Sequence, residues 1–169
     1  MIFRLASQAD IPRIMQIIDS AKLFFRESGI PQWQDGYPDS TSLREDILSG
    51  CSYVLCENGA VAATAAILFG KDRNYDNIYD GNWTAGGEYA VIHRIAVDSN
   101  QKKRGLASEI IQNAVRLARE RGLESIRVDT HEKNLPMRAM LEKNGFVYCG
   151  RVLLSDADNA PRIAFELRV

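Results

Sequence analysis

The segment from Gln101 to Ala107 reads Gln-Lys-Lys-Arg-Gly-Leu-Ala, so that three cations stand directly before a glycine and a helix-compatible run. A loop that enters a helix points free backbone amides and the positive end of the helix dipole at one spot, which is a binding geometry for phosphate. Gly105 has no Cβ to block close approach, and Ala107 keeps the next turn small. The same loop could equally be a plain turn with a solvated charged face, because it lacks the Walker spacing and the three-glycine dinucleotide fingerprint.

A strand and a helix must hold this loop. Tyr89 to Val97 is a mostly apolar strand, Gly105 to Gly122 carries apolar residues on one helical face, and Ser125 to Thr130 is a further strand. The other predicted strands are Ile2 to Leu5, Ser52 to Cys56, Ala60 to Phe69, Phe146 to Leu153 and Arg162 to Val169. The other predicted helices are one that starts at Ser7 with Asp10 three positions later and ends at Gly29, one capped by Thr41 or Ser42 that ends near Ser49, and one capped by Asn134 that ends at Lys143.

Turn signals complete the fold. Asn58-Gly59 predicts a tight hairpin turn, the polar stretch 70–87 a long excursion, and Asp156 to Asn159 a turn between the last two strands. Together the elements predict one α/β or α+β domain over residues 1–169, with a mixed, mostly antiparallel central sheet of about seven strands flanked by about four helices.

Composition narrows the class of protein. The chain has 169 residues, of which 46% are hydrophobic and 25% charged, as in an ordinary globular domain. Lys plus Arg number 21 against 22 Asp plus Glu, so no global basic field holds nucleic acid or an anionic membrane. The three cysteines show no metal-ligand spacing, and no apolar run approaches the roughly 20 residues of a membrane span. We therefore expect a cytoplasmic protein without a metal site.

Two spaced motifs resemble those of the GNAT superfamily of N-acetyltransferases. Ile92 to Val97, followed eight residues later by Gly105, resembles motif A, whose loop reads Arg or Gln, two variable residues, Gly, one variable residue, then Gly or Ala. Lys102 stands at the first position with Gln101 before it, and Gly105 and Ala107 match. Motif B runs from an Asn to a Gly-Phe pair eleven residues later, and the segment from Asn134 to Phe146 resembles it.

The resemblance implies acetyl-CoA as cosubstrate and a set of residues that bind it. The backbone of Ile95 and Val97 would pair with the pantetheine arm, and Asn134 would reach the same arm from the other side. Asn134 as a plain helix cap is at least as good a reading, and both roles can coexist. The pyrophosphate would bind the backbone amides of the loop residues, which are Lys102, Lys103, Arg104, Gly105, Leu106 and Ala107.

The implied reaction is attack of a neutral amine on a thioester, which needs a proton acceptor because an amine of pKa about 10.4 is almost wholly protonated near neutral pH. His93 is the first candidate, since imidazole titrates near neutrality and strand alternation puts it on one face with Val91, Ile95 and Val97. Some family members use a histidine here, whereas others place a carboxylate where this chain has Val91. A structural histidine is about equally compatible with the sequence, and Glu88 is the alternative base.

One family position departs from the pattern. Many members carry a tyrosine four residues before the motif B glycine to protonate the leaving thiolate, and that position is Leu141 here. Tyr148, Tyr89 or water would have to substitute, or activity would be weak.

Aromatic residues crowd the two irregular segments. Trp33, Tyr37 and Trp83 are candidates for the wall of an acceptor pocket, where a nearby carboxylate would suit a cationic amine. Aromatics that fasten loops to the core are the commoner case, so substrate identity is not readable from them.

These features predict an acetyl-CoA-dependent N-acetyltransferase that acts on a primary amine of a small molecule or a peptide. The alternative is a non-catalytic acyl-CoA-binding or sensing module, and a weaker third reading is a protein-interaction domain. Neither nucleic acid nor a membrane is an expected partner, and a homodimer is possible.

Overall fold

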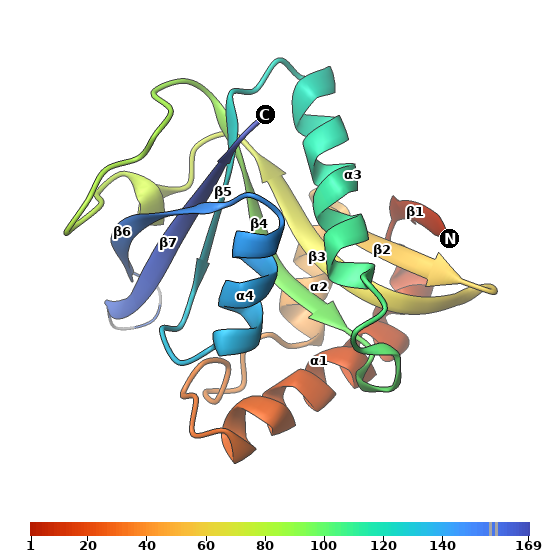
Figure 1. The fold of residues 1–169 in the computed structure, drawn as a ribbon. Helices are drawn as coiled ribbons and strands as arrows, with labels where there is room; N and C mark the ends of the chain where they lie inside the picture. Colours follow the sequence, from red (N-terminus) through yellow and green to blue (C-terminus); the bar gives the residue numbers. More distant parts are fainter. Residues whose placement is uncertain (156, 158) are drawn as a thin grey trace. The chain divides into compact units, whose positions relative to one another are not determined.

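The computed structural model describes residues 1–155, 157 and 159–169. The predicted turn from Asp156 to Asn159 includes Asp156 and Asp158, which lie outside the described residues. In the described part of the chain the strands are β1 Ile2–Leu5, β2 Ser52–Glu57, β3 Ala60–Phe69, β4 Tyr89–Val97, β5 Ser125–Thr130, β6 Val147–Leu154 and β7 Ala160–Arg168 (Figure 1). The α-helices are α1 Ile11–Glu27, α2 Ser40–Leu48, α3 Leu106–Glu120 and α4 Leu135–Lys143, and short 3-10 helices are η1 Gln8–Asp10, η2 Arg73–Tyr75 and η3 Ser99–Gln101.

The strands form a seven-stranded sheet in the order β1-β2-β3-β4-β5-β7-β6 over the described residues. β1, β2 and β3 pair antiparallel, as do β5, β7 and β6, whereas β4 and β5 pair in parallel. A parallel neighbour needs a crossover connection, and α3 lies in the connection between these two strands. The predicted mixed sheet of about seven strands with four helices is therefore confirmed.

Two compact units divide the chain. Unit 1 comprises residues 1–67 and 94–113, and unit 2 comprises residues 68–93 and 114–169. Each unit draws on two separate stretches of sequence, and both β4 and α3 run from one unit into the other. The single domain over residues 1–169 stays a prediction.

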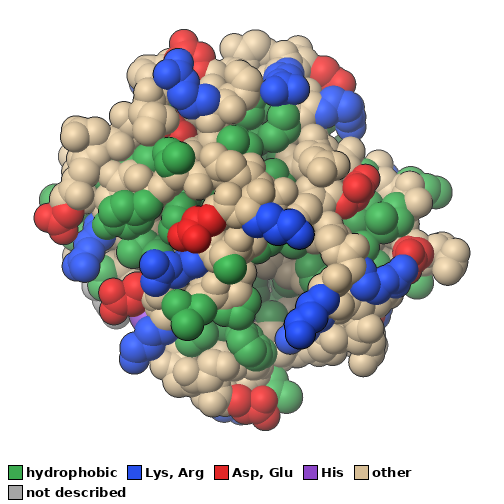
Figure 2. Space-filling view, in the orientation of Figure 1, with side chains coloured by type: hydrophobic (Ala, Val, Ile, Leu, Met, Phe, Trp, Pro, Cys, Tyr) green, Lys and Arg blue, Asp and Glu red, His purple; other side chains and the backbone are tan. Residues whose placement is uncertain are grey.

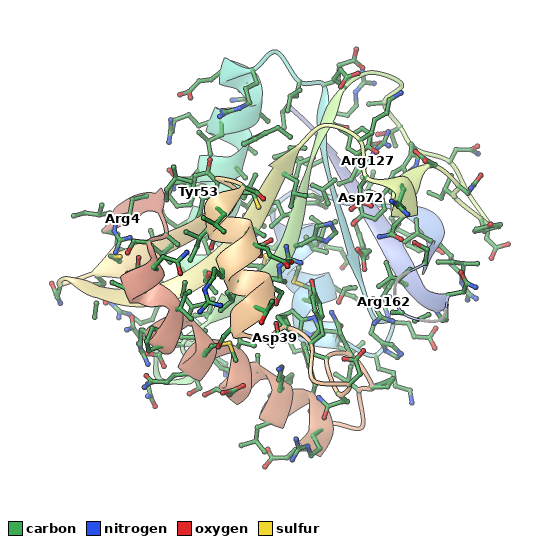
Figure 3. All side chains as sticks on the ribbon, turned by 180° about the vertical axis from the view of Figure 1, so that it is seen from behind. Arg4, Asp39, Tyr53, Asp72, Arg127 and Arg162 are labelled. Carbon is green, nitrogen blue, oxygen red and sulfur yellow. The ribbon has the colours of Figure 1, made fainter. Side chains whose placement is uncertain are left out.

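The core of unit 1 is built by the apolar face of α1 on β2 and β3. Ile14 and Ile18 are fully buried one turn apart, and Leu43 of α2 joins the same cluster as Val54 of β2 and Val61 of β3. Figure 3 shows α1 and α2 in front of these strands when the molecule is seen from behind. The spacing of apolar residues that predicts α1 is thus the spacing that fills this core.

The start of α2 differs from the prediction. Asp39, and not Thr41 or Ser42, is the N-cap: its carboxylate accepts the Ser42 amide at 2.8 Å, and the Ser42 hydroxyl accepts the Asp39 amide at 2.9 Å. This reciprocal pair is a capping box, in which the serine is the third helical residue rather than the cap. The predicted hairpin turn is confirmed, because Asn58 and Gly59 have φ angles of 50° and 81° between β2 and β3.

The core of unit 2 includes the long excursion between β3 and β4. Tyr75 of η2 packs in one cluster with Tyr89 of β4, Val152 of β6 and Ala164 of β7. The excursion also lies directly against β6, because a Cβ on Gly81 would stand 2.0 Å from the Cys149 carbonyl oxygen. α4 covers the face of these strands that is toward the viewer in Figure 1 and away from the viewer in Figure 3.

Charge on the surface is mixed, as the nearly balanced composition requires. Figure 2 shows basic and acidic side chains interspersed on the face drawn, with hydrophobic side chains between them. Among the described residues, no helix has the length and apolar character needed to cross a membrane.

Candidate active site

The loop after β4 in unit 1 begins with a buried carboxylate. Asp98 is 6% exposed, its amide donates to the Ala62 carbonyl at 2.9 Å, and its carboxylate accepts the Asn100 amide at 3.0 Å. Arg13 of α1 donates to the same carboxylate and, at 3.2 Å, to the Val61 carbonyl. The exit from β4 is thereby fixed to α1 and β3 before the basic loop begins.

The entrance of this loop into α3 has a left-handed backbone and the first amides of a helix. Lys103 and Gly105 have φ angles of 64° and 81°, and the Glu109 amide donates to the Gly105 carbonyl at 3.0 Å. Because that bond opens the helical ladder, the amides of Leu106 and Ala107 have no partner within the helix. A Cβ on Gly105 would meet no atom within 4 Å, so this entrance is open. The loop therefore fits an anionic group such as a pyrophosphate.

The cations of the loop are mostly occupied within the protein. Arg104 donates to both carboxylate oxygens of Glu57, at 2.7 and 2.9 Å, and Lys102 Nζ lies 4.7 Å from the centroid of the Phe24 ring. The hydrogen bond from Arg104 holds the pKa of Glu57 below its usual range. Lys103 is exposed at the left-handed position. Phosphate binding here would rest on amides and the helix dipole, with Lys103 as the available charge.

The middle of β4 is irregular at Arg94, whose φ of 54° is left-handed. Regular alternation ends there, so the prediction that Val91 and His93 share one face with Ile95 and Val97 does not carry across this residue.

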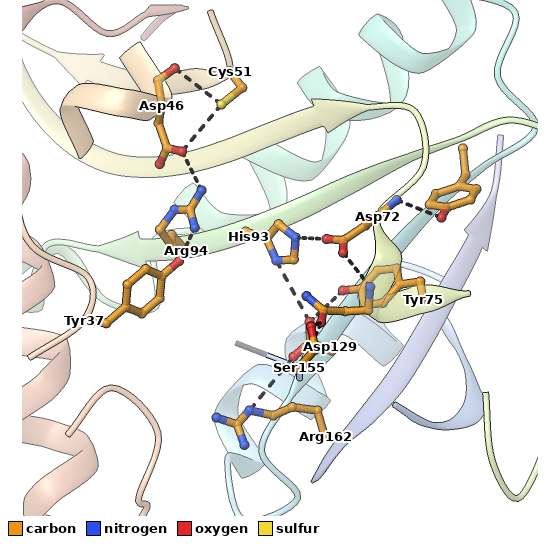
Figure 4. A network of polar contacts seen from close by, with 12 residues as sticks. Tyr37, Asp46, Cys51, Asp72, Tyr75, His93, Arg94, Asp129, Ser155 and Arg162 are labelled. Atoms are coloured by element: carbon orange, nitrogen blue, oxygen red, sulfur yellow. Dashed lines mark hydrogen bonds and ion pairs between the residues drawn. The ribbon is translucent and has the colours of Figure 1, made fainter. Parts of the chain in front are cut away.

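The side chain of Arg94 turns to a polar cluster within unit 1. It donates to Asp46 of α2 at 2.7 Å and to the Tyr37 hydroxyl (Figure 4). Tyr37 is 41% exposed and holds Arg94 over its ring at 5.7 Å. Trp33 packs edge-on against Phe25 at 5.4 Å between ring centroids. Trp33 thus fastens its loop to α1, whereas Tyr37 is partly exposed beside Arg94.

In unit 2, His93 lies among acidic and aromatic side chains (Figure 4). Its Nε2 is 2.8 Å from Oδ2 of Asp72, and its Nδ1 is 4.0 Å from Oδ1 of Asp129. The Tyr75 hydroxyl donates to the same Asp129 oxygen at 2.6 Å, and Arg162 Nε lies 4.0 Å from the other oxygen. His93, the predicted base, therefore lies beside two carboxylates, one of which also accepts the Tyr75 hydroxyl.

The protonation states around His93 follow from burial and hydrogen bonding. Burial would raise the pKa of Asp72, but hydrogen bonds from His93 and the Asn74 amide outweigh it and lower that pKa below its usual range. Burial, followed by the charge of Asp129, raises the pKa of Tyr75 well above its usual range. Asp72 is therefore ionised and Tyr75 is protonated at neutral pH.

The two aspartates were not among the predicted site residues. Asp72 caps η2, with its side chain accepting the Asn74 amide at 2.9 Å, and an Asp followed two residues later by Asn is a recognisable local turn signal. Asp129 lies near the end of β5, where a carboxylate among strand residues is unusual. Both signals were in the sequence, but neither indicated proximity to His93.

Unit 2 also contains the predicted residues Glu88, Tyr148 and Trp83, and Trp83 packs on the same Tyr75 ring as His93. Glu88 is exposed and directly precedes β4. Five residues of strand separate Glu88 from His93, which corresponds to about 16 Å. Tyr148 of β6 is 54% exposed and packs on Phe165 at 5.9 Å between ring centroids. Trp83 donates to the Tyr75 carbonyl at 3.1 Å and stacks on Arg127, which is a packing role.

Asn134 is a buried helix cap. Its Oδ1 accepts the Met137 amide at 3.3 Å, and its Nδ2 donates to the Thr130 hydroxyl at 3.2 Å. The cap reading is thus confirmed, and one Nδ2 hydrogen remains for any further partner. Leu141 of α4 is 0% exposed, so no acid stands at that position. Within the described residues, no group of three or more His, Cys, Asp or Glu side chains is arranged to hold a metal ion.

Comparison with known proteins gives a consistent result. A family model described as "Acetyltransferase (GNAT) family" matches residues 14–146. A GNAT-family acetyltransferase from Streptococcus agalactiae 2603 is 36% identical with a TM-score of 0.89, and the match covers 99% of this chain and 95% of that one. No curated protein matches the chain.

Two further solved structures share the fold at lower identity. Ribosomal-protein-alanine N-acetyltransferase from Brucella melitensis is 17% identical with a TM-score of 0.68, over all of both chains. The structure of yncA from Salmonella typhimurium with its cofactor acetyl-CoA is also 17% identical with a TM-score of 0.68, covering 99% of this chain and 93% of that one.

Proposed function

Because the chain belongs to the GNAT family of acetyltransferases, we propose that it transfers the acetyl group of acetyl-CoA to a primary amine of a small molecule or a peptide. The observation that carries this proposal is the loop from Lys102 to Ala107. It presents a left-handed glycine, an open entrance and amides that precede the first hydrogen bond within α3. The composition of the chain favours the cytoplasm as the place of this reaction.

The cosubstrate assignment has independent support. Acetyl-CoA is the named cofactor of the yncA structure, which shares this fold. In this chain the amides of Leu106 and Ala107, with the positive end of α3, would hold the pyrophosphate, and Lys103 would add a charge. Bound acetyl-CoA supplies an activated acetyl thioester, and the residues of this chain supply binding, orientation and proton transfer.

We assign the proton acceptor to His93. An amine of pKa about 10.4 is neutral in roughly one molecule per thousand near pH 7.4, so an acceptor must take a proton before or during attack. Two carboxylates lie beside the imidazole, and a negative charge stabilises the imidazolium that forms. Glu88 has no such surroundings and is the weaker candidate.

The leaving thiolate has no acidic side chain at position 141 to protonate it. Leu141 is fully buried and apolar, so the thiolate would take its proton from water or from an exposed group such as Tyr148. A thiol of pKa about 8.5 leaves readily enough that a missing acid slows turnover without preventing it. We therefore expect slower turnover than an acid at position 141 would allow.

Cofactor-dependent thermal stability tests the binding half of the proposal. Acetyl-CoA at a hundredfold above its Kd stabilises the folded state by about 2.7 kcal/mol, which raises the melting temperature measurably. Gly105→Glu should abolish this shift, because it adds a negative charge at the phosphate position. Gly122→Glu is the matched control, since Gly122 also has a positive φ and open space around it. Equal shifts in the two variants would contradict the assignment of the loop.

A non-catalytic acyl-CoA-binding module is the second candidate, and the buried Leu141 favours it. Both candidates bind acetyl-CoA, so only turnover separates them. Release of CoA would be measured with polyamines, amino acids, aminoglycosides and peptide N-termini as acceptors. Activity with one of them, lost in His93→Ala at unchanged acetyl-CoA affinity, supports the enzyme and its base.

A further inference from the structure

The hydrogen bond between His93 and Asp72 determines which imidazole nitrogen is basic. Asp72 is ionised and its carboxylate can only accept, so the hydrogen in the 2.8 Å contact belongs to Nε2 of His93. A neutral imidazole carries one hydrogen, and its Nδ1 is then a free acceptor. Nδ1 is therefore the atom able to take a proton.

Asp72 is itself held in place. Its Oδ1 accepts the Asn74 amide at 2.9 Å, and its own amide donates to the Tyr89 hydroxyl at 3.1 Å. The Asp72 side chain is 14% exposed, so water competes little for the bond to His93. These contacts come from η2 and β4, and they fix the carboxylate relative to the imidazole.

Nδ1 of His93 and Oδ1 of Asp129 form a pair of acceptors facing each other. Their separation of 4.0 Å is too long for a direct hydrogen bond. Oδ1 already accepts from Tyr75 at 2.6 Å but has a second lone pair. A group with two hydrogens placed between the two atoms could therefore donate to both of them at once.

An ammonium group matches this pair. A nitrogen placed about 2.8 Å from each acceptor would subtend an angle of about 90° between them, close to the angle of about 109° between the N–H bonds of an alkylammonium. Among the described residues, the ion-pair partners of His93 are Asp72 and Asp129, and Arg162 lies 4.0 Å from the far oxygen of Asp129. Two carboxylates against one guanidinium favour a cation, and they disfavour an amine that carries its own carboxylate alongside.

We infer that the acceptor is a cationic alkylamine whose ammonium group donates to both His93 Nδ1 and Asp129 Oδ1, with Asp72 as the positioning residue that keeps the hydrogen on Nε2. This inference rests on the proposed function. The ammonium gives one proton to Nδ1, which leaves a neutral amine and an imidazolium whose Nε2–H still donates to Asp72. The amine nitrogen then bonds to the thioester carbonyl carbon, the C–S bond breaks, and the sulfur leaves with the electron pair. The acetylated nitrogen loses its second proton and the thiolate gains one through water, which gives the neutral amide and the CoA thiol.

Nitrogen NMR of the imidazoles tests the tautomer without any need for turnover. The chain has only two histidines, so His131→Gln leaves His93 as the single imidazole signal. Long-range proton–nitrogen spectra should show hydrogen on Nε2 and none on Nδ1 at a pH where the ring is neutral. Asp72→Asn should lose this preference and Asp72→Glu should retain it. Hydrogen on Nδ1 in the parent protein would overturn the inference.

Titration with n-butylamine, present as its ammonium, tests the docking position. The Nδ1 signal should shift saturably, and Asp129→Asn should weaken binding about tenfold or more. Asp80→Asn is the control, because it removes the same charge from a side chain that is 73% exposed and that lies on the excursion between β3 and β4. No saturable shift, or equal weakening in both variants, would overturn the docking whether or not the protein is an enzyme.

Kinetics separates this inference from the proposed function. With an active acceptor, Asp129→Asn should raise the KM for the amine and leave the KM for acetyl-CoA unchanged. Asp72→Asn should lower kcat by about tenfold or more and shift the acidic limb of the pH–rate profile to lower pH, with partial rescue by Asp72→Glu. An unchanged amine KM in Asp129→Asn overturns the inference alone, whereas acetyl-CoA binding without turnover on any amine overturns the enzyme assignment.

Discussion

Arg127 and Glu166 stand directly opposite each other on β5 and β7, with Arg127 Nε 2.9 Å from Glu166 Oε1. Glu166 is 0% exposed, and its other oxygen accepts the Thr84 hydroxyl at 2.6 Å and the Ala85 amide at 3.0 Å. The Arg127 guanidinium stacks on Trp83 and on Tyr89 (Figure 3 labels Arg127). This ion pair therefore fastens the excursion that carries Asp72 to the strand that carries Asp129.

Removing the carboxylate of this pair should be costly. Glu166→Gln leaves the Arg127 charge buried without its counter-ion, and we expect the free energy of unfolding to fall by about 3–5 kcal/mol. Urea denaturation measures the change. Glu120→Gln, in the exposed helical pair with Arg116, is the control and should cost less than about 0.5 kcal/mol. Equal losses of unfolding free energy in the two variants would contradict the claim that burial makes the Arg127–Glu166 pair costly to break.

The cap of α4 gives a second prediction. Asn134→Ala removes the acceptor for the Met137 amide, so the free energy of unfolding should fall by about 1 kcal/mol or somewhat more. Asn134→Asp keeps a capping oxygen and should retain most of the stability. Thermal or urea unfolding of the two variants checks this, and a loss as large in the aspartate variant would argue against capping as the source of the effect.

Acid sensitivity should arise partly from Asp10. The hydrogen bond from Arg4 holds the pKa of Asp10 well below its usual range, with Ser7 helping and burial opposing. A carboxyl whose pKa is lower when folded than its unfolded value of about 3.9 stabilises the protein above that value and loses this contribution as the pH falls through the folded pKa.

The stability difference between the parent protein and Asp10→Asn should therefore be largest at neutral pH and shrink below about pH 4. Denaturation by urea across that range measures it. A difference independent of pH would mean that the charge of Asp10 contributes nothing to folding.

Several strands and helices could be predicted because their signals are local. The bounds of β4 and β5 agree with the predicted strands, and α4 begins directly after Asn134 as its cap predicts. Apolar periodicity, turn glycines and caps act over a few residues, so a sequence window contains the information. The Asp39 cap was missed because two other serine or threonine residues nearby fit the same rule.

The surroundings of His93 could not be predicted by such means. Asp72 lies 21 residues earlier in the chain and reaches the imidazole only because η2 and Tyr75 fold the excursion onto the sheet. Arg104 forms an ion pair with Glu57, 47 residues earlier in the chain, so one of the three cations of the loop is already neutralised by a carboxylate. The left-handed backbone of Arg94 interrupts the alternation of side-chain directions that the apolar residues on both sides predict for this strand. These features depend on tertiary packing, which overrides local pattern.

The central claim is acetyl transfer from acetyl-CoA to a primary amine, and the most direct measurement is acetyl-CoA-dependent modification of an amine by the purified protein. Acceptors from the alkylamine, polyamine and peptide classes would be incubated with acetyl-CoA, and both free CoA and the acetylated amine would be quantified. We predict equal amounts of both products with a cationic alkylamine, and loss of both in Gly105→Glu and His93→Ala. Saturable acetyl-CoA binding with no acetylated product from any acceptor would contradict the account.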